Sequence, residues 1–346
     1  MAFHLSSSAN RKLVVTKPHP SDAYPTQYRD LIDEETWAFI KRTNDCYPPD
    51  TADMTISEQR AIYDAMCREF FAGYPEGIEV ADGEIHLSGP ERSVPTRNYR
   101  PTGIGIMPDE QRPDAWVIYY HGGGFVVGGL DSHDDVCAEI CANTGYPVMS
   151  VDYRLGPEHV FPSDFEDAVG ALYSLTDMGV PLILVGDSAG GNLAAAVSHN
   201  SRQGRTSPAG QVLIYPGLGG RLDWGTFVTH AEAPMLTTAD TTFYKSIRTG
   251  GDDSVLTNPS CAPLEDHDFS NLPPSVVISA ECDPLSGDGE AYVEKIQAAG
   301  GKAVWFNEIG LVHGYLRARH SVGRARDSFG RICDAISTLG KDEWTY

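Results

Sequence analysis

Residues 181–192 read PLILVGDSAGGN, and this stretch decides the fold. The four apolar residues 182–185 are typical of a buried parallel strand, and they run directly into a G-x-S-x-G pentapeptide. A helix-like run, 193–197, follows at once. Strand, sharp turn and helix together indicate a nucleophile elbow, in which Gly186 and Gly190 let a strained turn pass close to its neighbours and Ser188 projects above the sheet. Taken alone, the pentapeptide also fits a glycine-rich turn with a surface serine.

The composition limits the class of protein. The chain has 346 residues, of which 41% are hydrophobic, so it is long enough for a large core in one α/β domain with or without a smaller appended piece. Acidic residues outnumber basic ones 48 to 26, which gives a net charge of -22. Such a surface repels phosphate backbones and anionic lipid, so nucleic-acid and membrane partners are disfavoured. Anionic substrates are disfavoured only weakly, because local charges decide their binding.

Targeting and metal signals are weak. Residues 1–15 lack an apolar core of signal-peptide length, and no stretch approaches membrane-spanning length. The seven cysteines form no paired framework. Cys137 and Cys141 lie one helical turn apart, but without a further ligand pair at zinc spacing we expect them to be buried small hydrophobes. We therefore expect a cytoplasmic protein with reduced thiols, no metal and no cofactor.

Strand-like and helix-like segments alternate on both sides of the elbow, which predicts right-handed crossovers and a mostly parallel sheet flanked by helices. Two helices are expected first, at 31–43 and in a segment opened by a capping box of Thr55 and Glu58. The expected strands are 78–87 and 94–99 as an antiparallel pair, then 115–120, 148–153, 182–185, 211–215, 275–279 and 302–306. The later helices are expected at 132–144, 163–175, 193–197, 289–299 and 317–339.

The chain divides into four segments on this pattern. Residues 1–75 are expected to form an N-terminal arm and cap helices, and the long insertion 219–257 a second cap element. Residues 76–218 and 258–346 are expected to form the catalytic domain.

Acyl transfer through a serine needs a base, a group that orients the base, and donors for the oxyanion. His313 is the candidate base among 11 histidines, because it follows the last predicted strand in a loop with a flanking glycine, where it would lie over the elbow. Asp283 is the candidate orienter, since it directly follows a strand, although an Asp before Pro also caps helices. Asp288 competes with it but falls in or beside the next helix. His320 is assigned to the final helix, and His199 follows the elbow helix.

The oxyanion donors are predicted in the run His121-Gly122-Gly123-Gly124, which follows the apolar strand ending at Tyr120. Glycines leave backbone amides unshielded, so two of them are expected to face a developing alkoxide together with the amide of Ala189. His121 is interpreted as an organiser of this loop. A flexible turn is the alternative for the glycine run alone.

These motifs together resemble the hormone-sensitive-lipase-like (bacterial family IV) esterases of the α/β-hydrolase superfamily. The resemblance covers roughly residues 80–320 and rests on these segments: HGGGF at 121–125, VDYRL at 151–155, PEH at 157–159, GDSAGG at 186–191, NLPP at 271–274, DPL at 283–285 and VHG at 312–314. It implies an α/β-hydrolase fold with a helical cap and hydrolysis of short-acyl carboxylic esters. The implied triad is Ser188, Asp283 and His313, and the implied oxyanion hole is Gly122, Gly123, Gly124 and Ala189. Gly287 and Gly156 depart from the family's usual acidic residue and alanine.

The substrate pocket is less well marked, because 1–75 and 219–257 match the family only loosely. Candidate lining residues are Phe125, Tyr153, Trp224, Phe227 and Leu285, with core packing as the alternative for each.

The same motifs also fit other functions. A lactonase, an amidase or peptidase, or a metabolite-specific deacetylase would use the same triad. Some members of the resembled family are hormone receptors that have lost the histidine, which His313 argues against. Ser188 in place of an aspartate disfavours epoxide hydrolases and dehalogenases.

Because the last strand, 302–306, carries two aromatics at an expected sheet edge, we also predict a homodimer through this strand and the last helix.

Overall fold

The computed structural model describes residues 23–103, 113–202, 204 and 206–346. Most of the expected N-terminal arm, residues 1–22, lies outside the described residues. The eight strands of one sheet are β1 (Ile78–Leu87), β2 (Arg92–Pro101), β3 (Trp116–Tyr120), β4 (Val148–Val151), β5 (Leu182–Asp187), β6 (Gly210–Ile214), β7 (Ser275–Cys282) and β8 (Ala303–Val312).

The sheet is mostly parallel, as predicted. Its strand order is β1-β2-β4-β3-β5-β6-β7-β8. β1 pairs with β2 and β2 with β4 in antiparallel fashion, whereas all pairs from β4 to β8 are parallel. Every residue of β3, β5 and β6 is buried, which explains their near-continuous apolar sequence.

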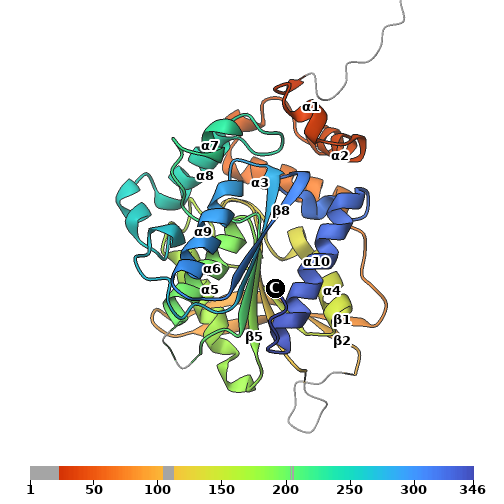
Figure 1. The fold of residues 1–346 in the computed structure, drawn as a ribbon. Coiled ribbons are helices and arrows are strands. Elements are labelled where there is room, and N and C mark those ends of the chain that lie inside the picture. The colour runs from red at the N-terminus through yellow and green to blue at the C-terminus, as the bar shows by residue number, and fades with distance from the viewer. Residues whose placement is uncertain (1–22, 104–112, 203, 205) are drawn as a thin grey trace, which may run out of the picture.

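Helices cover both faces of the sheet (Figure 1). The α-helices are α1 (Tyr28–Leu31), α2 (Glu34–Asn44), α3 (Ile56–Phe70), α4 (Asp134–Thr144), α5 (Ser163–Ser174), α6 (Ala189–Ser201), α7 (Thr226–Thr229), α8 (Thr238–Thr249), α9 (Ser286–Ala298) and α10 (Gly323–Gly340). α4 and α10 pack into one hydrophobic core with one side of the sheet, and α5, α6 and α9 into a second core with the other. Short 3₁₀ turns, such as Tyr315–Ala318, complete the chain.

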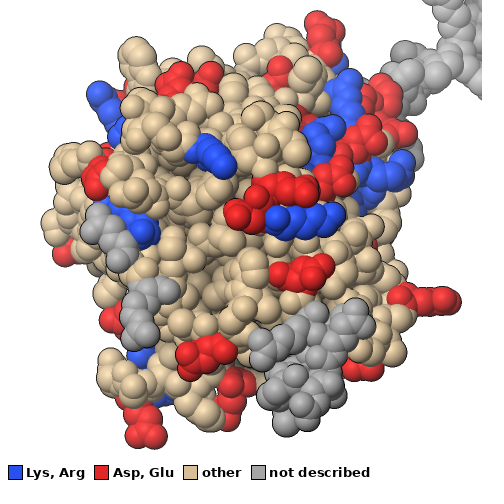
Figure 2. Space-filling view, turned by 60° about the horizontal axis from the view of Figure 1, so that its bottom comes forward, with Lys and Arg blue, Asp and Glu red and all other residues tan. Residues whose placement is uncertain are grey.

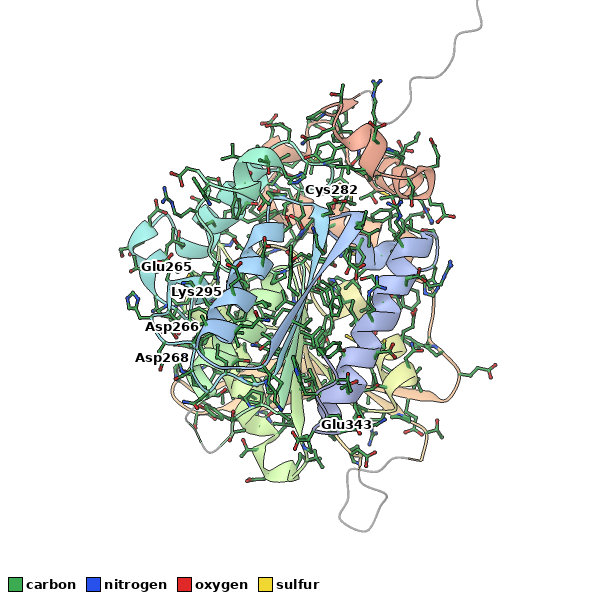
Figure 3. The ribbon with its side chains drawn as sticks, viewed as in Figure 1. Glu265, Asp266, Asp268, Cys282, Lys295 and Glu343 are labelled. Atoms are coloured by element: carbon green, nitrogen blue, oxygen red, sulfur yellow. The ribbon has the colours of Figure 1, made fainter. Side chains whose placement is uncertain are left out.

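The carboxyl ends of the parallel strands bring distant segments together. β3, β5, β7 and β8 all end on this side, followed by the glycine run, Ser188, Asp283 and His313 respectively. Figure 3 places Cys282, the last residue of β7, at this upper end, while Glu343 lies at the opposite end. Parallel topology therefore gathers the predicted site residues at one edge.

The N-terminal helices and α7 and α8 lie over the same end of the sheet (Figure 1). The two segments touch, because Gln27 Nε2 donates to the carbonyl of Thr229 at 3.0 Å and the Tyr28 hydroxyl hydrogen-bonds His230 Nδ1 at 3.0 Å. The helix predicted at 31–43 is α2, which begins three residues later than predicted and is preceded by the short helix α1. Asp33 adopts an extended conformation and accepts a hydrogen bond from the Thr36 amide at 2.8 Å, so it caps α2 rather than continuing α1. The capping box of Thr55 and Glu58 is confirmed at the start of α3.

The last helix begins later than the sequence predicted. A 3₁₀ turn occupies Tyr315–Ala318, and α10 starts only at Gly323. His320 therefore lies in the connection between the two, where its Nε2 contacts Glu139 at 2.7 Å.

The surface and the thiols agree with a globular chain. On the face in Figure 2, acidic and basic side chains are interspersed between large uncharged areas. All seven cysteines are free, and Cys137 and Cys141 lie on the buried side of α4. Across the described part of the chain, no helix has the length and apolarity needed to cross a membrane, and no cluster of three or more candidate ligands for a metal ion is present.

Candidate active site

Ser188 lies in the sharp turn between β5 and α6. Its backbone is in a left-handed region, with φ 54° and ψ -116°, which a non-glycine residue adopts only under strain. The turn is held because the Ser188 amide donates to the carbonyl of Ile214 at 2.8 Å. A Cβ on Gly186 would lie 2.3 Å from Gly190, and a Cβ on Gly190 would lie 1.8 Å from the carbonyl oxygen of Tyr120. Both flanking glycines are thus required by the close approach of backbone to backbone.

This packing predicts that alanine substitution lowers the stability of the protein much more at Gly190 than at Gly330, although both glycines lie in helices. Gly190→Ala should destabilise the protein by about 3 kcal/mol or more, because the backbone of β3 cannot yield to the new methyl group. Gly330→Ala is the matched control, since nothing lies within 4 Å of its Cβ position in α10. It should be neutral or stabilising by up to about 1 kcal/mol. Urea unfolding measures both, and equal effects would contradict this account of the elbow.

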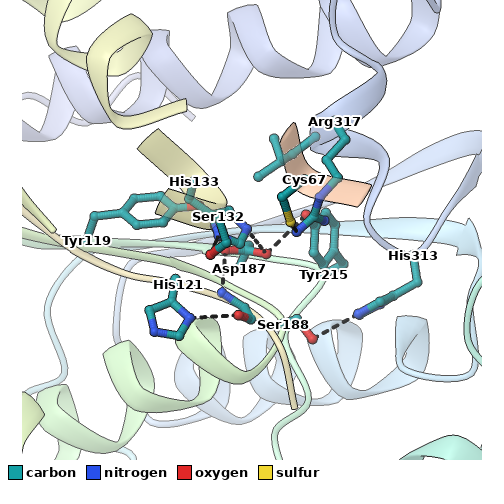
Figure 4. Close-up of polar contacts among 12 residues, drawn as sticks. Cys67, Tyr119, His121, Ser132, His133, Asp187, Ser188, Tyr215, His313 and Arg317 are labelled. Atoms are coloured by element: carbon teal, nitrogen blue, oxygen red, sulfur yellow. Dashed lines mark hydrogen bonds and ion pairs between the residues drawn. The ribbon is translucent and has the colours of Figure 1, made fainter. Parts of the chain in front are cut away.

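The structure brings Ser188, His313 and Asp283 together (Figure 4 shows the first two). His313 Nε2 lies 2.8 Å from Ser188 Oγ, and His313 Nδ1 lies 2.7 Å from Asp283 Oδ2. Asp283 is fully buried, and its Oδ1 accepts a hydrogen bond from the Leu285 amide at 2.9 Å. One carboxylate oxygen is therefore fixed by the backbone while the other faces the imidazole. This geometry suits a nucleophile, a base and an orienter.

The other candidates for the base and the orienter make different contacts. Asp288 is in α9, where Oδ2 accepts from the amides of Leu218 at 2.7 Å and Gly220 at 3.2 Å, and burial raises its pKa to about 6. His199 pairs with Asp266 at 2.7 Å. His121 is buried, which lowers its pKa to about 4, and its Nδ1 lies 2.8 Å from the carbonyl of Gly122. A neutral His121 in this position holds the glycine loop in place.

The glycine loop requires one correction. The amide of Gly122 already donates to Asp187 Oδ1 at 2.9 Å, so Gly122 has no free N–H for an oxyanion. Within the described residues, the amides of Gly123 and Gly124 have no hydrogen-bond partner. Ala189 is the first residue of α6, and its amide is one of those that a helix leaves unpaired. Three of the four predicted donors are thus available.

Asp187 anchors this loop, and sequence reasoning missed it. Besides the Gly122 amide, its carboxylate accepts from the hydroxyls of Tyr119 at 2.8 Å and Tyr215 at 3.3 Å and contacts His133 Nε2 at 3.2 Å (Figure 4). Burial alone would raise the pKa of Asp187, but His133 and the other partners bring it below its usual range. The available signal was its position next to Ser188 in the elbow.

Ser188 lines two hollows. The first, called here the inner cavity, has a volume of about 100 Å³ and is lined by Ser188, Ala189, Asn192, Phe227, Arg248 and Leu285, among others. The second, called the outer hollow, has a volume of about 530 Å³ and is lined by Tyr63, Gly123, Gly124, Ser188, His313 and Arg317, among others. Tyr244 of α8 lines both, as Leu236 does.

The predicted pocket residues divide into two groups. Phe125, Phe227 and Leu285 line the inner cavity. Tyr153 and Trp224 line neither hollow, which corrects their assignment. Tyr153 is buried behind the glycine loop, where its hydroxyl donates to the carbonyl of His121 at 2.7 Å. Trp224 lies in the turn before α7 and is 74% exposed.

Known proteins are similar to this chain in sequence. The family described as alpha/beta hydrolase fold matches residues 117–317. The chain is 33% identical over 278 residues to the carboxylic ester hydrolase LipN of Mycobacterium tuberculosis, covering 76% of this chain and 71% of LipN. It is 32% identical over 255 residues to an ethyl acetate hydrolase of Pseudomonas putida, covering 70% and 78%. These matches confirm the resemblance found in the sequence.

The fold is also similar to those of solved structures. The iron-lacking apo form of ESTFA has a TM-score of 0.79 and 29% identity, covering 89% of this chain and all of that one. An esterase of Pyrobaculum calidifontis has a TM-score of 0.76 and 30% identity, covering 89% and 99%.

Proposed function

We propose that this chain, which belongs to the alpha/beta hydrolase fold family, is a serine carboxylesterase that hydrolyses short-chain acyl esters through an acyl-enzyme. The observation that carries the proposal is the unbroken line of hydrogen bonds from Ser188 Oγ through His313 to Asp283, at 2.8 and 2.7 Å. The names of the relatives, carboxylic ester hydrolase and ethyl acetate hydrolase, support the same reaction class.

The geometry supports the following sequence of steps. With the proton on Nδ1, His313 donates to Asp283, and its Nε2 accepts the proton of Ser188 as the hydroxyl attacks the ester carbonyl. The amides of Gly123, Gly124 and Ala189 stabilise the alkoxide that forms. The alcohol then leaves with the proton from His313, and water repeats the cycle on the acyl group. Buried Asp283 stabilises the charged imidazole during both halves.

The two hollows are assigned to the two parts of the ester. The leaving alcohol must lie next to His313, because His313 gives it a proton. His313 lines the outer hollow and not the inner cavity, so the alcohol occupies the outer hollow. The acyl group then occupies the inner cavity, whose volume of about 100 Å³ suits only a few carbon atoms.

We also propose that residues 1–75 and 219–257 act as a two-part cap on a catalytic domain of 76–218 and 258–346. Tyr47 and Tyr63 from the first segment and Phe243 and Tyr244 from the second line the outer hollow. A substrate entering the outer hollow passes between these segments.

The test is release of 4-nitrophenol from esters of acetate through decanoate. We expect turnover that is highest for the shortest esters and falls steeply once the acyl chain exceeds the inner cavity. A flat or rising profile would contradict the assignment of the inner cavity. No turnover by folded protein would favour a lactone, an amide or a metabolite-specific acetyl group as the substrate, or a small-molecule receptor.

A homodimer remains a proposal, and the structure describes the surface it would use. β8 is an edge strand, as predicted, and its Ile309 is 67% exposed. The Tyr346 ring covers part of the strand, with its centroid 5.9 Å from that of the Phe306 ring.

A cytoplasmic location is likewise a prediction, supported by the seven free thiols.

The dimer is tested by light scattering at micromolar concentration. We expect a dimeric mass for the wild type and a monomeric mass for Ile309→Glu, because a buried unpaired carboxylate is costly at an interface. Val228→Glu is the control, since Val228 is an exposed apolar residue of α7, away from β8. A monomeric wild type would refute the proposal.

A further inference from the structure

The inner cavity contains two cationic side chains, although apolar groups form most of the rest of its wall. Lys245 and Arg248 lie one turn apart on α8, so they face the same side of that helix. Both line the cavity that also contains Ser188. An apolar acyl chain can neither accept a hydrogen bond from these cations nor neutralise their charge.

Arg248 is only 5% exposed, and its contacts leave one nitrogen free. Its Nε donates to Asp164 Oδ2 at 2.7 Å, and its Nη1 donates to the carbonyl of Cys261 at 2.9 Å and to Asn192 Oδ1 at 3.2 Å. The guanidinium lies 3.6 Å above the ring of Phe125, another residue of the cavity wall. Among the described residues Nη2 has no hydrogen-bond partner. A buried unpaired donor is costly, and a ligand group that accepts from Nη2 would remove that cost.

Lys245 adds a second donor without a partner. In the described part of the chain it makes no hydrogen bond and no ion pair, although it is partly buried. The opposing charges are Asp164, which neutralises Arg248 from outside the cavity, and Asp288, which lines it. Asp288 is held by the amides of Leu218 and Gly220. The cavity wall itself thus contains two cations and one carboxylate.

These charges lie in the direction in which the acyl group would extend from Ser188. Ser188 and Asn192 lie one turn apart at the start of α6, and Asn192 accepts from Arg248. The helical rise from Ser188 to Asn192 is about 6 Å, and the wall continues from the Asn192 side chain to Arg248. An acyl group attached to Ser188 extends in this direction, because the leaving alcohol occupies the outer hollow.

We propose that the inner cavity binds acyl groups that end in a carboxylate, so that the preferred substrates are half-esters of short dicarboxylic acids. This inference rests on the proposed esterase function and deepens it. The terminal carboxylate accepts from Arg248 Nη2 and from the Lys245 ammonium, while Ser188 attacks the ester carbonyl at the other end.

Three ethyl esters of similar shape test the proposal, with ethanol release as the common readout. They are monoethyl succinate, which is anionic, ethyl levulinate, which has a neutral acceptor, and ethyl 4-methylpentanoate, which is apolar. We expect kcat/KM to be higher for monoethyl succinate than for ethyl 4-methylpentanoate by about tenfold or more, the size of one charge-assisted hydrogen bond, with ethyl levulinate between them.

Variants then identify the groups responsible. Replacing Arg248 alone would leave the charge of Asp164 buried and unpaired. The test therefore replaces Lys245 instead. Lys245→Met should lower the ratio of the succinate to the 4-methylpentanoate rate about tenfold, and Asp288→Asn should raise it by removing the opposing charge. Lys302→Met, an exposed lysine that immediately precedes β8 at the far end of the sheet, should leave the ratio unchanged.

The outcomes separate this inference from the proposed function. Equal or faster hydrolysis of the apolar ester would overturn the carboxylate preference while leaving the esterase intact. A preference for the half-ester that survives Lys245→Met and is unaffected by Asp288→Asn would overturn the assignment to this cavity. Failure on all three esters and on 4-nitrophenyl acetate would overturn the proposed function itself.

Discussion

Replacing Ser188 with alanine is expected to lower kcat on 4-nitrophenyl acetate by about a million-fold. The variant loses the atom that attacks the carbonyl, and the 2.8 Å contact with His313 Nε2 disappears with it. The fold should persist, because the elbow is held by the Ser188 amide and by the flanking glycines, not by the hydroxyl. Initial rates at saturating ester measure the effect.

The matched control is Ser174→Ala, the same change at an exposed position at the end of α5. Its kcat should equal that of the wild type. Should Ser188→Ala retain activity within tenfold of the wild type, Ser188 would not be the nucleophile, and the proposed mechanism would be wrong.

Asp283→Asn is expected to lower kcat by about ten-thousand-fold. Asp283 Oδ2 accepts from His313 Nδ1 at 2.7 Å and so keeps Nε2 free to accept the proton of Ser188. An asparagine in its place can donate to Nδ1, which moves the imidazole proton to Nε2 and leaves no acceptor for the hydroxyl. The rate on 4-nitrophenyl acetate measures the loss.

The comparison with Asp288→Asn makes this prediction discriminating. Asp288 contacts backbone amides and not His313, so the loss of kcat on this neutral ester should be far smaller. The reverse order of effects would make Asp288 the orienter.

The sequence predicted the parallel part of the sheet well, because each of its strands is a short apolar run bounded by turns. The elbow was equally clear, since Gly186 and Gly190 are required by contacts within the turn and with the strand beside it. Once these elements were placed, the carboxyl ends of β5, β7 and β8 had to lie together, and this predicted the proximity of Ser188, Asp283 and His313.

The remaining features depend on tertiary contacts that no local pattern records. The Gly122 amide is occupied because Asp187 from a different strand reaches it. Arg248 of α8 lines a cavity, where it donates to Asn192 of α6, whereas Trp224, an apolar residue in the same insertion, faces solvent. Residue type alone placed Trp224 in the pocket, and no local pattern indicated Arg248.

Labelling with diethyl 4-nitrophenyl phosphate tests the central claim most directly. Attack by a serine hydroxyl forms an O–P bond and expels 4-nitrophenolate, and the diethylphosphoryl enzyme that results can be located by mass spectrometry. Our account predicts one such group per chain, on Ser188, with matching loss of esterase activity and no labelling of Ser188→Ala. A label on another residue, or full activity in protein labelled at Ser188, would contradict it.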